Sequence, residues 1–230
     1  MNEFRVYILF NVKKPELGNN FNRTWIDKRI QLFKDYTLKS LQQQTDQEFA
    51  IDLICCPGSA TLFRLEDYAI PNVTLHFGTE DYFEYLNAYF NNVYLLKIDS
   101  DDLYHKNVVG LCKKSLSGTG IKVLSFINGY AYNLATKDIN FFGNGVSFYC
   151  TYFGGDTFNF ANFKKHCFCD QTIVRKQFNP LIVKDRMFCV LDHDLNLHKD
   201  PRRNGTELLK RNGFGAKVGE LKNLKDFGIS

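Results

Sequence analysis

Short apolar segments alternate with helical stretches through the first hundred residues, and this alternation constrains the fold of the chain more than any other feature. The strand-like segments are 5–12, 49–56, 73–77 and 93–98, and the helix-like segments between them are 25–44, 60–68 and 81–91. Strands that alternate with helices favour a mostly parallel sheet with crossover helices. The sequence therefore predicts an α/β fold whose ligand site lies outside the carboxyl ends of the strands.

The pattern changes in the second half of the chain. Residues 106–115 predict a helix, whereas 122–133 and 140–152 are aromatic-rich and predict antiparallel strands. A further strand is expected at 187–191, and helical stretches separated by glycines are expected within 205–224. At 230 residues, the chain has the length of one ordinary α/β domain.

Composition excludes several classes of protein. The seven cysteines show no Cys-x-x-Cys pairing of the kind that structural zinc prefers. The first residues lack the long apolar segment of a signal peptide, and no apolar run is long enough to span a membrane. We therefore expect a cytoplasmic protein with reduced thiols.

The formal net charge is +4, and the excess of basic residues lies mostly in the last thirty residues. Their density is too low to predict nucleic-acid binding, so no nucleic-acid partner is expected. A basic tail of this kind can contact an anionic membrane surface peripherally. The alternative is a solvated surface helix.

Three carboxylates, those of Asp99, Asp101 and Asp102, directly follow the apolar strand at 93–98. Carboxylates this close repel one another, and a hard divalent cation such as Mn²⁺ or Mg²⁺ removes that repulsion. Mg²⁺ commonly combines one or two carboxylates with substrate phosphates. The cluster therefore predicts a metal shared between the protein and a diphosphate. The alternative is a polar loop that caps the next helix.

The segment Ile98-Asp99-Ser100-Asp101-Asp102, after an apolar strand, resembles the Asp-x-Asp signature of glycosyltransferases with the GT-A fold. Other segments resemble a bacterial rhamnosyltransferase family in the same order along the chain. They are Phe10-Asn11, Trp25, Arg29, Leu32-Phe33, Tyr36-Thr37-Leu38, Ser40-Leu41, Gln44-Thr45, Phe126-Ile127-Asn128-Gly129-Tyr130 and His193-Asp194-Leu195-Asn196. The chain departs from the family pattern at Lys97, where an arginine is usual, so the resemblance leaves the transferred sugar open.

The resemblance implies a metal-dependent glycosyltransferase that moves a hexose or deoxyhexose from a nucleoside-diphosphate sugar to a hydroxyl of a carbohydrate or other acceptor. It implies that Asp101 and Asp102 contact Mn²⁺ or Mg²⁺, and that Asp99 holds the ribose or a metal-bound water. His193 is the candidate for a third metal ligand or a phosphate contact. The implied fold is GT-A, a Rossmann-like, mostly parallel central sheet with an antiparallel acceptor-side portion.

The resemblance also divides the chain. Residues 1–204 are expected to form the glycosyltransferase domain, with 1–105 as the nucleotide-sugar-binding half and 106–204 as the acceptor-side half. Residues 205–230 are expected to form a basic C-terminal helical tail.

Further residues are candidates for binding the donor. Arg29 and Lys97 are basic groups that can meet phosphate, Arg29 as a fork and Lys97 as a point charge. Phe10, Asn11 and Asp52 are expected near the carboxyl ends of early strands, where the base and ribose would lie. For each of these, an ordinary surface or core role is the alternative.

An inverting reaction needs a carboxylate that removes the proton of the acceptor hydroxyl. Asp156, after Gly154-Gly155, and Asp170, beside Gln171, are the candidates. The paired glycines allow a tight loop at a ligand and equally a plain turn.

Two other functions share features with this sequence. Phosphatases of the haloacid dehalogenase type place a nucleophilic aspartate at a strand end with a second acid two residues later. In those proteins the motif normally lies near the N-terminus, whereas here it begins at Asp99. A non-catalytic carbohydrate-binding module that uses Ca²⁺ is the other alternative, although no complete EF-hand loop is present.

Overall fold

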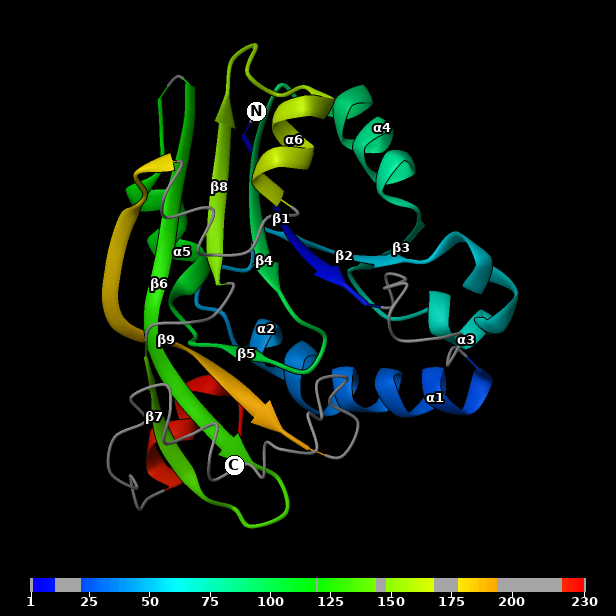
Figure 1. The fold of residues 1–230 in the computed structure, drawn as a ribbon, viewed down its shortest axis with the longest axis vertical. Helices are drawn as coiled ribbons and strands as arrows, with labels where there is room; N and C mark the ends of the chain where they lie inside the picture. The colour runs from blue at the N-terminus through cyan, green and yellow to red at the C-terminus, as the bar shows by residue number, and fades with distance from the viewer. Residues whose placement is uncertain are drawn as a thin grey trace.

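The computed structural model describes residues 2–10, 22–118, 120–143, 148–167, 178–193 and 221–229. In these residues the chain forms one sheet with the order β3-β2-β1-β4-β8-β6-β9-β5, and β7 pairs with β6 (Figure 1). The strands are β1 (Asn2–Leu9), β2 (Ala50–Cys55), β3 (Val73–Phe77), β4 (Asn92–Ile98), β5 (Leu103–Tyr104), β6 (Gly120–Asn133), β7 (Ile139–Gly143), β8 (Tyr149–Gly154) and β9 (Leu181–Asp192).

The helices of the first 115 residues lie within a few residues of the predicted segments, whereas α6 (Phe160–Cys167) was not predicted. The helices are α1 (Arg23–Leu32), the π-helical η2 (Phe33–Thr37), α2 (Leu38–Gln42), the 3₁₀ helix η3 (Pro57–Leu62), α3 (Leu65–Tyr68), α4 (Thr79–Tyr89), α5 (Val108–Ser115), α6 (Phe160–Cys167) and the 3₁₀ helix η4 (Leu221–Phe227). None of the helices in the described part of the chain has the length and apolar character needed to cross a bilayer.

The sheet has a parallel part and a part dominated by antiparallel pairs, as predicted. Strands β3, β2, β1 and β4 are all parallel. Strand β8 is antiparallel to both β4 and β6, and β7 is antiparallel to β6. Strand β9 returns parallel to β6, a pairing that the sequence pattern did not predict. The α/β class and the division of its sheet are confirmed.

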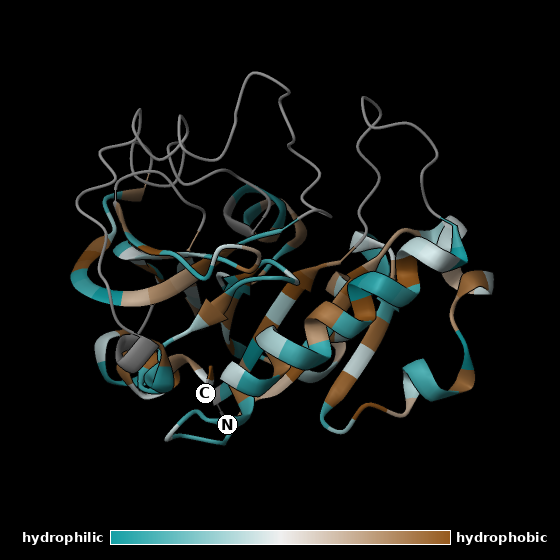
Figure 2. Cartoon of the chain, turned by 90° about the horizontal axis from the view of Figure 1, so that it is seen from below, coloured by the Kyte–Doolittle hydropathy of each residue, from teal (hydrophilic) through white to brown (hydrophobic). Residues whose placement is uncertain are grey.

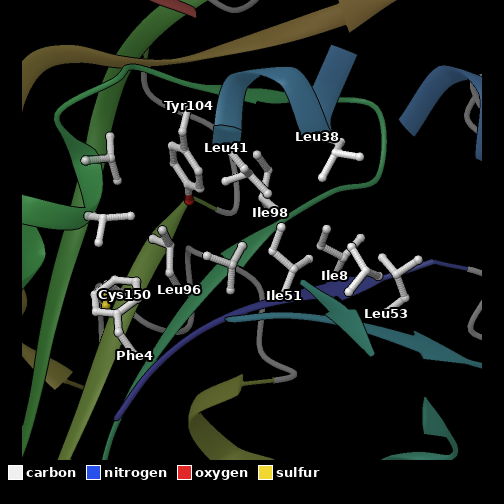
Figure 3. Packing of buried hydrophobic residues seen from close by; sticks show 14 of the residues in the cluster. Phe4, Ile8, Leu38, Leu41, Ile51, Leu53, Leu96, Ile98, Tyr104 and Cys150 are labelled. Carbon is white, nitrogen blue, oxygen red and sulfur yellow. The ribbon is translucent and has the colours of Figure 1, made fainter. Parts of the chain in front are cut away.

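Side chains that alternate along each strand bury both faces of the parallel part. On β1, Val6 and Ile8 pack in the cluster that includes Ile26 of α1. Figure 3 shows Ile8 within this cluster, near Leu53 of β2. Tyr7 points to the other face and joins the cluster that contains Tyr82 of α4 and Phe163 of α6. Helices therefore cover both faces, and each carries hydrophilic as well as hydrophobic residues (Figure 2).

The final described segment, residues 221–229, packs against the same domain. Leu224 and Phe227 are fully buried in the cluster that contains Leu103 of β5 and Tyr130 of β6. This part of the expected C-terminal tail therefore contributes to the domain core. The remainder of the expected tail, 205–220, lies outside the described residues.

Candidate functional site

The acidic cluster forms a turn, residues 99–102, that joins β4 to β5. The Asp102 N–H donates to the Asp99 carbonyl oxygen at 3.2 Å, which closes the turn. Because Ile8 of β1 pairs with Ile98 of β4, the turn lies beside the carboxyl end of β1 as well as β4. This is the edge of a parallel sheet where ligands bind.

Two cationic or potentially cationic side chains hold Asp101. The Arg29 Nη1 donates to Asp101 Oδ2 at 2.8 Å, and His193 Nε2 lies 2.9 Å from the same oxygen. Burial acts to raise the pKa of Asp101, but the His193 hydrogen bond and the Arg29 charge outweigh it and bring the pKa to about 2. Asp101 is therefore a fixed anion at neutral pH.

Arg29 reaches the turn from α1. Asn22 caps this helix by accepting a hydrogen bond from the Trp25 N–H at 2.9 Å, so the helix begins at Arg23. The Trp25 ring lies 5.7 Å from the Arg29 Cζ, and Arg29 Nη2 donates to the Ser100 hydroxyl. The guanidinium is thus held by an aromatic ring and by two consecutive residues of the acidic turn.

Asp102 ties the turn to β9. Its Oδ1 accepts a hydrogen bond from the Leu191 N–H at 3.2 Å, and its residue is only 5% exposed. Burial raises the pKa of Asp102 well above its ordinary value, and the charges of Asp101 and Asp99 raise it further. The ionised form of Asp102 is therefore disfavoured in this turn, and a nearby cation would favour it.

The position of β9 beside the acidic turn depends on a close approach between the backbones of β9 and β6. The register of this pair shifts at Asn128 and Gly129, opposite Phe188. A Cβ atom at position 129 would overlap the Phe188 carbonyl oxygen, so only glycine allows the two backbones to lie this close. This packing places Leu191 and His193 at the acidic turn.

Among the described residues, no group of three or more His, Cys, Asp or Glu side chains is arranged to hold a metal ion. The exposed Asp99 and the partly exposed Asp101, two residues apart in the sequence, nevertheless offer hard oxygen ligands. Mg²⁺ usually takes one or two carboxylates and completes its shell with phosphate and water oxygens. The donor set fits a divalent cation that is shared with a diphosphate.

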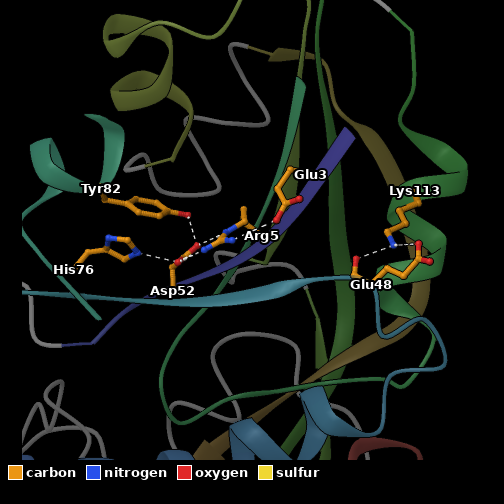
Figure 4. Close-up of polar contacts among 7 residues, drawn as sticks. All are labelled: Glu3, Arg5, Glu48, Asp52, His76, Tyr82 and Lys113. Carbon is orange, nitrogen blue, oxygen red and sulfur yellow. Dashed lines mark hydrogen bonds and ion pairs between the residues drawn. The ribbon is translucent and has the colours of Figure 1, made fainter. Parts of the chain in front are cut away.

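Asp52 lies elsewhere. It is the third residue of β2 rather than a residue of its carboxyl end, and it is completely buried. Its Oδ2 accepts from Arg5 Nε at 2.7 Å and from the Tyr82 hydroxyl at 3.0 Å, while His76 Nε2 lies 2.8 Å from Oδ1 (Figure 4). With Glu3, which accepts from Arg5 Nη1 at 3.3 Å, these side chains form a charged network inside the fold and away from the carboxyl edge of the sheet.

Phe10 and Lys97 lie close to the predicted donor edge. Phe10 directly follows β1, is buried, and packs its ring edge-on against Trp25 at a centroid separation of 6.5 Å. Lys97 precedes the last residue of β4; it is 8% exposed, and its Nζ lies 5.7 Å from the Tyr149 ring. Asn11 lies outside the described residues.

Asp156 does not lie near the acidic turn, and this placement corrects its assignment as a general base. Strand β8 runs antiparallel to β4, so its end lies beside the start of β4, where the Gly155 N–H donates to Asn92 Oδ1 at 2.8 Å. The turn begins after Ile98, six residues further along β4, or roughly 20 Å at about 3.3 Å per residue. The other candidate, Asp170, lies outside the described residues.

Two groups of the site were not singled out from the sequence. The Ser100 hydroxyl and the Leu191 N–H fix the turn from opposite sides. Ser100 lies between two aspartates, so its sequence position was the available signal for a role in the turn. The Leu191 contact spans 89 residues and involves a backbone group, so the sequence carries no signal for it.

The fold and site together define an α/β protein with an acidic binding turn at the carboxyl edge of its parallel strands. The model of the family described as "Putative rhamnosyl transferase" matches residues 16–74. The resemblance inferred from the sequence is thus confirmed over that segment, which includes α1, α2 and β2. A comparison with curated proteins finds no match.

Solved structures share a distant likeness with most of the chain. One is Staphylococcus aureus TarS 1-349 in complex with UDP-GlcNAc, with 13% identity and a TM-score of 0.45 over 84% of this chain. This chain spans 59% of that TarS chain. Another is a protein from Desulfovibrio desulfuricans G20 described as a "putative nucleotide-diphospho-sugar transferase", with 14% identity and a TM-score of 0.40 over 93% of this chain and 92% of that one.

Proposed function

We propose that this protein is a metal-dependent glycosyltransferase that moves a hexose or deoxyhexose from a nucleoside-diphosphate sugar to an acceptor hydroxyl. The observation that carries the proposal is the acidic turn beyond β4, whose Asp101 is held by Arg29 and His193 at the ligand-binding edge of the sheet. The family match over residues 16–74 supports the same class of enzyme.

The chain's residues divide the work of donor binding. The base and ribose would lie over the ends of β1 and β4, near Phe10, and the diphosphate would lie against residues 99–102. Asp101 and Asp102 would hold the Mn²⁺ or Mg²⁺, and Asp99 the ribose or a metal-bound water. When bound, such a cation acts as a Lewis acid that stabilises the charge of the departing nucleoside diphosphate.

His193 has a defined place in this arrangement. Its Nε2 is bonded to Asp101 Oδ2, so it orients the carboxylate in the state described here. A direct contact from His193 to a metal or phosphate would require that bond to be exchanged. For the acceptor hydroxyl, Asp170 remains the candidate base if the reaction inverts the anomeric centre.

The two alternative functions make different chemical predictions. A phosphatase would form a covalent phosphate ester on Asp99, which mass spectrometry of a trapped intermediate would detect. A carbohydrate-binding module would bind sugar without consuming any nucleotide sugar. The family match over residues 16–74 favours neither alternative.

The proposal is tested by thermal unfolding with UDP, GDP, dTDP and CDP, each with and without Mn²⁺. A ligand at about 100 times its Kd stabilises a protein by roughly 2.7 kcal/mol. In a chain of this length the melting temperature then rises by about 5–10 °C. We expect that rise for one nucleotide, only with Mn²⁺. A folded protein that responds to none of the four would contradict the proposal.

A further inference from the structure

We propose that Arg29 is a positioning residue that orients Asp101 and does not bind the donor's diphosphate. This role differs from the phosphate contact that the sequence suggested for Arg29, and it rests on the proposed function. Three observations support this role: the hydrogen bonds that the guanidinium makes, the contacts of the helical segment that carries it, and the ion pair between Arg29 and Asp101.

The guanidinium of Arg29 is committed to the acidic turn. Nη1 bonds Asp101 and Nη2 bonds Ser100, so both ends of the planar fork meet consecutive residues. The Arg29 side chain is 6% exposed, whereas that of Asp101 is 13% exposed. The Arg29 Nε is buried without a hydrogen-bond partner, so it has a donor to spare but little surface through which a phosphate could reach it, and Asp101 is the more accessible of the two.

The helical segment that begins with α1 also contacts the chain beyond the acidic turn. On α2, the Ser40 hydroxyl accepts from the Tyr104 N–H at 3.3 Å. Two residues beyond the end of α2, the Gln44 side chain donates to the His105 carbonyl at 2.9 Å and accepts from the Val109 N–H at 3.1 Å. The segment from α1 to Gln44 therefore contacts residues 100–109 at several points, and Arg29 makes the first of these contacts.

The π-helical segment η2 lies between Arg29 and Ser40. A π-helical turn adds a residue to the helix and changes which side chains share a face, and such turns are frequent at functional sites. In this helix it separates the part that contacts the acidic turn from the part that contacts β5 and α5. The register that results directs both parts to the same stretch of chain.

The contacts of Asp101 leave one carboxylate oxygen bonded to the protein and the other available for a cation. Both Arg29 and His193 bond Oδ2, and in the described part of the chain no contact is recorded for Oδ1. Arg29 thus offsets the negative charge of Asp101 and restricts the orientation of its carboxylate. Oδ1 is the oxygen left for a cation. Partners that orient a metal ligand commonly affect metal affinity by about 10–100-fold.

The test is a double-mutant cycle of wild type, Arg29→Gln, Asp101→Asn and the double variant, with Mn²⁺ affinity measured by titration calorimetry. We expect Arg29→Gln to weaken Mn²⁺ binding by about 10–100-fold. It should cause no further loss in the Asp101→Asn background, because its effect passes through Asp101. Lys28→Gln, on the exposed face of the same helix, is the matched control and should bind Mn²⁺ like wild type.

A second readout separates positioning from direct phosphate binding. Nucleoside-diphosphate affinity is measured in EDTA for the same variants and for Arg29→Lys, which keeps the charge if the glutamine variant unfolds. Positioning predicts a change smaller than about threefold, since the phosphates do not touch Arg29. A loss of tenfold or more in EDTA, or additive effects in the Mn²⁺ cycle, would overturn the proposal.

The same four proteins distinguish this inference from the proposed function. If the wild type binds neither Mn²⁺ nor any nucleotide, the proposed function is contradicted. Urea unfolding of the cycle then decides the role of Arg29. A non-additive change in the free energy of unfolding supports the Arg29–Asp101 contact, and additive changes overturn it.

Discussion

Two aspartates in this protein, Asp52 and Asp101, are each held by an arginine and a histidine, but they lie in different parts of the sheet. Asp52 lies inside β2, between Arg5 and His76. Asp101 lies in the turn after β4, between Arg29 and His193. Burial opposes ionisation of both, and in both the hydrogen bonds and nearby charges outweigh it and lower the pKa.

The difference between the two networks lies in what remains available. Both oxygens of Asp52 are bonded, the Tyr82 hydroxyl adds a further contact, and the side chain has no exposed surface. The contacts of Asp101 fall on one oxygen, and its side chain keeps 13% exposure. The same residue types thus stabilise the fold in the middle of β2 and form a candidate ligand site in the turn after β4.

The largest effect expected from this comparison is on folding. Replacing Asp52 with alanine leaves Arg5, a residue that is 4% exposed, with Glu3 as its one anionic partner among the described residues. Breaking a buried ion pair from one side costs about 3–5 kcal/mol, and we expect that loss in the free energy of unfolding, measured with urea.

The matched control is Glu48→Ala, which removes an exposed carboxylate that lies 3.7 Å from the Lys113 Nζ (Figure 4). Exposed ion pairs contribute about 0–1 kcal/mol, so this variant should remain close to wild type. Equal losses in the two variants would show that Asp52 has no special structural role.

The second effect is on ligand binding. Asp101→Asn removes the Asp101 carboxylate, which we propose as a metal ligand. The stabilisation of roughly 2.7 kcal/mol that nucleotide and Mn²⁺ give at about 100 times Kd should therefore disappear. The unliganded variant should still unfold cooperatively. Differential scanning fluorimetry with and without ligand measures both. A ligand-induced shift that survives in Asp101→Asn would remove Asp101 from the site.

The third effect is the pH dependence of stability. The pKa of Asp52 is lowered in the folded state, so its contribution is complete above its unfolded-state pKa of about 3.9 and is lost as the pH falls through the lower folded value. The stability difference between wild type and Asp52→Asn should therefore be constant from about pH 7 to 5 and shrink below about pH 4. Urea unfolding at each pH measures it. A difference that grows on acidification would contradict this sign.

The smallest effect is expected at the opposite end of the sheet. Asp156 is exposed in the loop after β8, at the start of β4. Asp156→Asn should change the free energy of unfolding by less than about 0.5 kcal/mol and leave nucleotide binding unchanged. A large loss of activity in this variant would return Asp156 to the list of candidate bases.

The strands and helices of the parallel part could be predicted from local pattern. Strand β3 was predicted at 73–77 and is found there, and the helix expected at 25–44 is present as α1, η2 and α2. The π-helical turn within it has no local signal, since residues 33–37 fit an α-helix equally well. The aromatic stretch 140–152 was expected as one strand and instead contributes to β7 and β8.

The candidate site was predictable only in its local part. The position of Asp99, Asp101 and Asp102 after an apolar strand placed them at a strand end. The partners of Asp101 lie 72 and 92 residues away, and no local pattern encodes such pairs. Asp156 was misplaced because the antiparallel direction of β8 reverses which end of the sheet its loop meets.

The most direct test of the central claim is turnover of nucleotide sugars. Wild type, Asp101→Asn and Lys28→Gln are incubated with a panel of UDP-, GDP-, dTDP- and CDP-sugars and Mn²⁺, and the released nucleoside diphosphate is measured. We expect slow hydrolysis of one donor by wild type and Lys28→Gln, lost in Asp101→Asn and on addition of EDTA. Release that is equal in Asp101→Asn, or none from any donor by a folded wild type, would contradict a glycosyltransferase site at the acidic turn.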